Sequence, residues 1–106
     1  MPENMAGFPY WQVSFDESGQ PAAQAEVDTL LADLPGQALT DLFLFSHGWN
    51  NDVVAARATY ARYFQTMRDV LNTAGLRFDR ANSIGMVGII WPSILWPDNQ
   101  PAPLLR

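Results

Sequence analysis

Three short apolar runs along the chain are typical of β-strands. Residues 10–15 combine aromatic and β-branched side chains, and a turn sequence follows at residues 16–19. Residues 41–46 and 84–91 are almost continuously apolar. Such runs are typical of strands that are covered on both faces. We therefore expect residues 41–46 to form a central parallel strand and residues 84–91 to form a second buried strand.

The stretch between the first two runs has apolar residues at helical spacing. Pro21 suits the first turn of a helix over residues 21–34, and the pair Pro35-Gly36 ends it. The positions that recur every three or four residues are Ala23, Val27, Leu30, Leu31 and Leu34. This pattern predicts a helix with one apolar face.

A second and longer helix is predicted over residues 53–74. Asn50 or Asn51 can cap it, Asp52 suits the positive end of its dipole, and Gly75 is a fitting stop. Its apolar stripe consists of Val53, Ala56, Tyr60, Phe64, Met67, Leu71 and Ala74. One face of this helix is expected to pack on a sheet.

The predicted elements follow one another in the order β-α-β-α-β. This order is typical of an α/β fold in which helices flank a parallel sheet and the crossovers are right-handed. With 106 residues, 48% of them hydrophobic, the chain is expected to form a single domain over residues 1–106. Residues 92–106 hold four prolines and no periodicity, which predicts a proline-rich tail or loop.

Composition excludes several classes of partner and cofactor. Eleven acidic and six basic residues give a net charge of -5, and the bases do not cluster, so we expect no nucleic-acid partner. The chain has no cysteine and one histidine, so we expect no disulfide, no metal and no cofactor. It also has no signal-peptide pattern and no apolar stretch of the roughly 18 residues that a membrane span requires. A soluble cytoplasmic protein is therefore expected.

The tetrad His47-Gly48-Trp49-Asn50 carries the strongest chemical signal. It follows a predicted strand and precedes the longer predicted helix. Backbone N–H groups at such a turn, and in the first turn of the helix behind it, lack intrahelical partners and lie at the positive end of the helix dipole. Gly48 has no Cβ, so a substrate oxygen can approach the backbone closely. The tetrad therefore predicts a site for an anion or an oxyanion.

The segment LFLFSHGWNND, a helix and the run GMVGIIWPS resemble part of the α/β-hydrolase superfamily. The matching elements are its third strand, oxyanion turn, first helix and fourth strand, and the likeness is strongest to bacterial uncharacterised hydrolases with an HGWN or HGYN turn. The resemblance covers roughly residues 40–93. It implies that the Trp49 backbone N–H forms half of an oxyanion hole, and that His47 and Gly48 shape the turn.

The sequence departs from the family where the other catalytic residues are expected. No G-x-S-x-G motif occurs, and the only histidine lies in the turn. Ser46 adjoins His47, but neighbouring strand residues point to opposite faces, so we expect no hydrogen-bonded Ser46–His47 dyad. Ser93 and Asp98 are candidates for the nucleophile and the acid, but the sequence leaves no histidine to act as their base, so we expect them to be loop residues. We therefore expect a truncated, N-terminal portion of an esterase-like or lipase-like hydrolase, inactive alone, whose small-molecule acyl substrate is processed only when the missing half completes it.

The alternative is a non-catalytic α/β module that binds a protein partner. If strands are missing beyond the fourth, the sheet should have an open edge and should be prone to self-association. We expect this edge to expose Ile89, Trp91 or the cluster Ile94-Leu95-Trp96.

Overall fold

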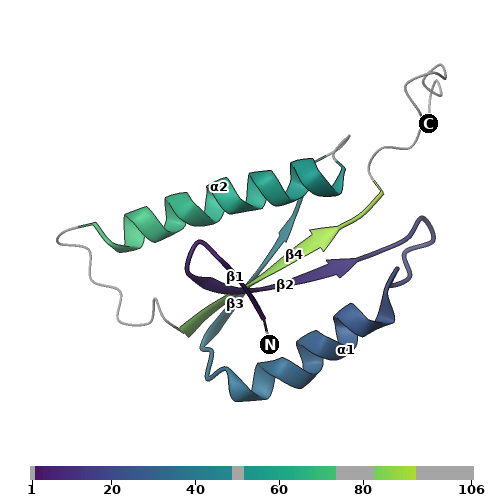
Figure 1. Ribbon diagram of the computed structural model, residues 1–106, viewed down its shortest axis with the longest axis horizontal. Helices are drawn as coiled ribbons and strands as arrows, with labels where there is room; N and C mark the ends of the chain where they lie inside the picture. The colour runs from purple at the N-terminus through teal and green to yellow at the C-terminus, as the bar shows by residue number, and fades with distance from the viewer. Residues whose placement is uncertain (1, 49–51, 74–82, 93–106) are drawn as a thin grey trace.

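The computed structural model describes residues 2–48, 52–73 and 83–92 (Figure 1). In these ranges the chain forms a four-stranded sheet with a helix on either side. The elements in chain order are β1 (Glu3–Met5), β2 (Phe8–Ser14), α1 (Gln24–Asp33), the short 3-10 helix η1 (Leu34–Gly36), β3 (Asp41–Ser46), α2 (Val53–Leu71) and β4 (Ile84–Ile90). The predicted α/β class, with helices against a sheet, is confirmed.

The sheet is mixed, which differs from the expected parallel sheet. Its strand order is β1-β2-β4-β3, and β2, β4 and β3 run parallel to one another. The additional strand β1 pairs antiparallel with β2. The two residues that join them, Ala6 and Gly7, both have positive φ, at 54° and 86°. Two such residues are typical of a tight hairpin turn, which the sequence pattern did not indicate because alanine seldom adopts this conformation.

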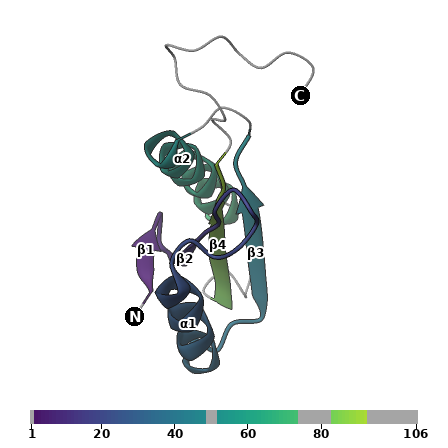
Figure 2. The same cartoon turned by 90° about the vertical axis from the view of Figure 1, so that its right-hand side faces the viewer.

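The two helices lie on opposite faces of the sheet (Figure 2). The connection through α1 leads from β2 past β4 to β3, whereas the connection through α2 leads back from β3 to β4. Right-handed crossovers that advance in opposite directions place their helices on opposite faces. Residues of α1 accordingly pack against Trp11, Val13 and Val87, while α2 covers the other face.

The larger core lies between the sheet and α2. It contains the hydrophobic side chains of Met5, Phe8, Tyr10, Ala56, Tyr60, Phe64, Ile84, Met86 and Ile90. Phe64 is completely buried, and its ring lies 5.0 Å from that of Phe45 and 6.0 Å from those of Tyr10 and Tyr60. The helical stripe predicted from the sequence therefore faces this core at its central positions, Ala56, Tyr60 and Phe64.

The prediction that residues 41–46 form a central, doubly covered strand is wrong. These residues form β3, but β3 lies at the edge of the sheet and pairs only with β4 among the described strands. Leu42 and Phe43 are 37% and 39% exposed, and Leu44 is 63% exposed. The central positions belong to β2 and β4, because the α1 crossover passes β4 before it reaches β3.

The expected open edge is also misplaced. β4 lies between β2 and β3, so Ile89 and Trp91 are partly buried rather than uncovered. The cluster at residues 94–96, like the rest of the predicted tail after Pro92, lies outside the described residues. The exposed apolar edge is formed by Leu42, Phe43 and Leu44 instead.

We predict that the fold loses stability in alkaline solution between about pH 10 and pH 12. Burial raises the pKa of the Tyr10 hydroxyl from 10.0 to about 12, and burial also raises the pKa of Tyr60. The unfolded chain releases these protons at lower pH than the folded chain does. Stability is therefore constant below the unfolded pKa and falls as the pH rises towards the folded one. Urea unfolding at a series of pH values measures this slope.

The Tyr10→Phe variant is the control for this titration. The Tyr10 hydroxyl is buried without a hydrogen-bond partner among the described residues, so its removal should cost nothing at neutral pH and could add up to about 1 kcal/mol. The free energy of unfolding of the variant should also fall less steeply as the pH rises above about 10. An unchanged alkaline slope would contradict a role for Tyr10.

Candidate functional site

The carboxyl ends of the three parallel strands meet at one edge of the sheet. Ser14 at the end of β2 is in register with Ile90 of β4, and Ser46 at the end of β3 is in register with Ile89. The predicted oxyanion turn begins directly after Ser46, and α2 begins shortly after the turn. The turn therefore starts at the edge where parallel α/β sheets usually bind their ligands.

His47 is buried, with 5% of its surface exposed, and both of its ring nitrogens are engaged. The backbone N–H of Trp91 donates to Nε2 at 3.1 Å, so Nε2 must be an acceptor. Nδ1 lies 2.8 Å from the carbonyl oxygen of Gly48 and is therefore the protonated nitrogen that donates to it. This arrangement requires a neutral imidazole and leaves neither nitrogen available to act as a general base.

Trp91 completes a reciprocal contact with His47. The two rings stack with centroids 5.3 Å apart and an angle of 6° between their planes. The indole Nε1–H donates to the backbone carbonyl of His47 at 3.0 Å. Each residue thus binds the main chain of the other with its side chain. The start of the turn after β3 is consequently fixed to the end of β4.

Tyr60 of α2 supports the same edge from the core side. Its single O–H group is shared between two carbonyl oxygens, that of Ile89 at 2.6 Å and that of Phe45 at 3.1 Å. These carbonyls lie near the ends of β4 and β3, next to the turn. The sequence identified Tyr60 only as a core residue. Its position in the stripe indicated burial, but nothing local indicated the two strand ends that its hydroxyl reaches.

The N-terminus of α2 is capped by Asp52, not by Asn50 or Asn51 as expected. The Asp52 carboxylate accepts a hydrogen bond of 2.7 Å from the backbone N–H of Ala55. This bond satisfies one of the N–H groups that a helix N-terminus leaves without a partner. The carboxylate also places a negative charge at the end of the helix where an anion would otherwise be favoured.

The structure places only part of the predicted site. His47 is buried, whereas Gly48 and Ser46 are exposed. Trp49, the predicted oxyanion donor, lies outside the described residues, as do Ser93 and Asp98. The roles of Trp49, Gly48 and His47 in an oxyanion turn therefore stay predictions.

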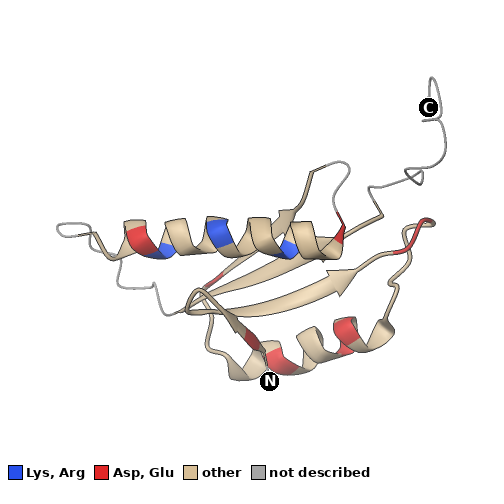
Figure 3. Ribbon diagram, turned by 45° about the horizontal axis from the view of Figure 1, so that its top comes forward, with Lys and Arg blue, Asp and Glu red and all other residues tan. Residues whose placement is uncertain are grey.

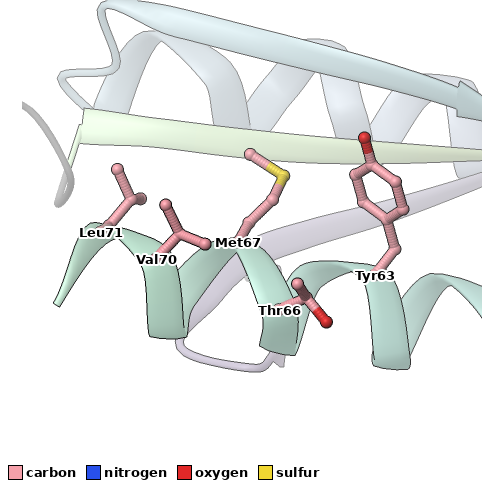
Figure 4. Close-up of a pocket in the computed structure, with 5 residues that line it drawn as sticks. All are labelled: Tyr63, Thr66, Met67, Val70 and Leu71. Atoms are coloured by element: carbon pink, nitrogen blue, oxygen red, sulfur yellow. The ribbon is translucent and has the colours of Figure 1, made fainter. Parts of the chain in front are cut away.

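An apolar groove of about 340 Å³ lies elsewhere, on the second half of α2 (Figure 4). It is lined by Tyr63, Thr66, Met67, Val70 and Leu71. Because α2 starts at the carboxyl edge and runs away from it, this groove is remote from the turn.

In the described parts of the chain, no group of three or more acidic or histidine side chains could hold a metal ion. No helix within these parts is long and apolar enough to cross a bilayer.

We predict that His47→Phe destabilises the fold by about 2 kcal/mol. Phenylalanine keeps an aromatic ring against Trp91 but removes the acceptor for the Trp91 backbone N–H and the donor to the Gly48 carbonyl. Chemical denaturation measures the difference. The exposed neighbour provides a control, since Ser46→Ala should change stability by less than about 0.5 kcal/mol. Equal stability of the two variants would show that the His47 contacts do not hold the turn.

Comparisons of this chain with protein-family models, with curated proteins and with solved structures found no match.

Proposed function

We propose that this chain is the oxyanion-turn portion of an α/β-hydrolase-like enzyme that hydrolyses esters or similar acyl compounds. The observation that carries the proposal is the position of the turn. It begins at the carboxyl ends of the three parallel strands, is fixed there by His47 and Trp91, and leads into the N-terminus of α2. Backbone N–H groups in such a position favour negative charge on a substrate oxygen.

The proposed chemistry divides between this chain and residues outside it. The Trp49 backbone N–H stabilises the oxyanion that forms when a nucleophile attacks a carbonyl, and Gly48 allows the substrate to approach. One such donor contributes about 3 kcal/mol to transition-state stabilisation. The engaged nitrogens of His47 fit a positioning role rather than that of the base. The nucleophile, the acid and the base are therefore contributed from outside these 106 residues.

Binding of an oxyanion mimic tests the turn directly. Methylphosphonate titrated into ¹⁵N-labelled protein should shift the amide signals of Gly48 and Trp49. In Asp52→Asn the cap is kept while its negative charge is lost, so this variant should bind the anion more tightly. Gly48→Val should weaken binding, because it adds a branched side chain where the substrate oxygen approaches. If the Gly48 and Trp49 signals shift neither in the parent protein nor in Asp52→Asn, the proposal is overturned.

We predict that the chain alone does not hydrolyse a short-chain nitrophenyl ester above background, because it lacks the nucleophile and the base. Initial rates at several substrate concentrations check this. Saturable turnover that disappears in Ser46→Ala or Ser93→Ala would show that the nucleophile is in this chain. Turnover that persists without any serine would refute the hydrolase proposal.

A non-catalytic module that binds a protein partner is the second candidate. It is favoured by the edge strand β3, whose residues Leu42, Phe43 and Leu44 are exposed on both faces of the sheet. Exposed, uncharged strand edges of this kind are typical of binding surfaces.

A further inference from the structure

On the face of the sheet that carries α1, no described helix covers β3. The helix α1 packs on Trp11, Val13 and Val87, which belong to β2 and β4 (Figure 2). Leu42 lies on this face. A Cβ added to Gly85 would meet the side chains of Leu39, Trp11 and Leu42, and the first two belong to the cluster on the α1 side. Leu44, two residues further along the strand, points the same way. The two leucines are 37% and 63% exposed.

The side of α1 that faces β3 is apolar as well. The opposite side of the helix faces β1, since Ala25, Glu26 and Thr29 line a shallow pocket together with Glu3. Leu30 packs on the sheet, and Leu31 lies about 100° around the helix from it, in the direction away from Thr29. Leu31 is 63% exposed. Leu31 therefore forms a wall beside the floor made by Leu42 and Leu44, and we call these three residues the α1-side surface.

The dimensions of the α1-side surface suit a helix. Strands are about 4.8 Å apart and neighbouring helices about 8–10 Å, so one helix covers about two strands. With α1 over β2 and β4, the next helical position lies over β3 and the space beyond its edge. An extended segment pairing with β3 alone would leave Leu31 and much of Leu44 exposed.

The charged residues around the α1-side surface indicate which kind of helix could bind to it. The described part of α1 has three acidic residues and no basic one, namely Glu26, Asp28 and Asp33, and all arginines within the described residues lie on α2 (Figure 3). Asp28 lies one turn before Leu31 on the same side of α1. Asp41 directly precedes Leu42 and lines a pocket together with Leu34, Leu39 and Leu42. The α1-side surface is thus apolar with an acidic rim.

We propose that the α1-side surface binds an amphipathic helix of a protein partner, with leucine-like residues on its apolar face and lysine or arginine on its flanks. This mode of recognition lays an apolar helical stripe into a groove and uses the flanking charges for orientation. A second copy of this chain fits the rim less well. Its α1 is acidic, and of the three arginines on its α2, Arg57 and Arg68 already contact Glu3 and the carbonyls of Ala6 and Gly7, which leaves Arg62 for the acidic rim. The inference deepens the partner-binding candidate and is independent of the oxyanion turn.

A pair of synthetic peptides tests the proposal on the whole chain. One peptide of about 18 residues has leucines at helical spacing and lysines elsewhere, and its counterpart has glutamates in place of the lysines. Isothermal calorimetry should detect binding of the lysine peptide only. Amide shifts in ¹⁵N-labelled protein should centre on Leu31, Leu42 and Leu44. Equal binding of both peptides, or shifts centred on α2, would overturn the proposal.

Matched variants separate specific docking from attraction to an acidic protein. Leu44→Glu should weaken binding of the lysine peptide at least tenfold, although it makes the protein more acidic. Val54→Glu makes the same change at a residue that is 78% exposed in the first turn of α2, and it should leave binding unchanged or slightly stronger. Equal effects of the two variants would refute the α1-side surface as the site. Circular dichroism of both variants verifies that the fold is kept.

Two further measurements test a second copy of the chain and the oxyanion turn. If sedimentation shows that the chain forms a dimer and that Leu44→Glu abolishes it, a second copy occupies the surface and the proposal is wrong. Gly48→Val should not affect peptide binding. Failure of the methylphosphonate titration and failure of the peptide titration are therefore distinguishable.

Discussion

Gly88→Ala is expected to destabilise the fold by about 3 kcal/mol. A Cβ at position 88 would lie 2.2 Å from the Tyr10 hydroxyl oxygen and 2.8 Å from two ring carbons of Tyr10. Tyr10 is 1% exposed and is confined by Phe64 and by the Arg57 guanidinium, which lies 5.6 Å from the Tyr10 ring centroid. Neither the ring nor the central strand β4 can move aside without disturbing the larger core.

Urea unfolding of this variant should be compared with that of Gly36→Ala. A Cβ added at position 36 would meet no atom within 4 Å beyond its chain neighbours, so the control should stay within about 0.5 kcal/mol of the parent. The double variant Gly88→Ala, Tyr10→Leu should lose less than the two single variants together, because the clash is absent. A Gly88→Ala protein as stable as the control would mean that Tyr10 does not pack over β4.

Phe64→Ala should cost about 4 kcal/mol, the largest loss expected from a single side chain. Phe64 is fully buried and connects α2 with β2 and β3 through its ring contacts with Phe8, Tyr10 and Phe45. Truncation removes the contacts of one whole ring and leaves a cavity between helix and sheet. The free energy of unfolding from urea titrations gives the loss.

Val70→Ala on the same helix is the control for Phe64→Ala. Val70 is 52% exposed, so its truncation should change stability by less than about 0.5 kcal/mol. A loss of about 1 kcal/mol or less for Phe64→Ala would show that the packing between α2 and the sheet is much looser than the structure indicates.

The helices and the buried strand β4 could be predicted from the sequence because their signals are local. Apolar residues every three or four positions indicated α2 with one sheet-facing stripe, and the apolar run at residues 84–91 indicated β4. The bounds of β3 were also predicted at residues 41–46. The short strand β1 was missed, since three residues carry no usable periodicity and its turn uses a positive φ at Ala6.

The position of each strand in the sheet was decided by the tertiary structure. An apolar run indicates that a strand can be covered on both faces, but it does not say which strands lie beside it. The α1 crossover passes over β4, so β3 became the edge strand and β2 became central. The exposed apolar side chains of β3 follow from this order and not from their own sequence.

The candidate site shows the same division between sequence and tertiary structure. The sequence by itself determined that a turn with His47 and Gly48 follows a strand and precedes a helix, because strand, turn and helix are adjacent in the chain. Only the pairing of β3 with β4 brought His47 to Trp91, which is 44 positions away, and only the packing of α2 brought the Tyr60 hydroxyl to both strand ends. Contacts between residues this far apart depend on strand order and helix packing, which local patterns of hydrophobicity do not encode.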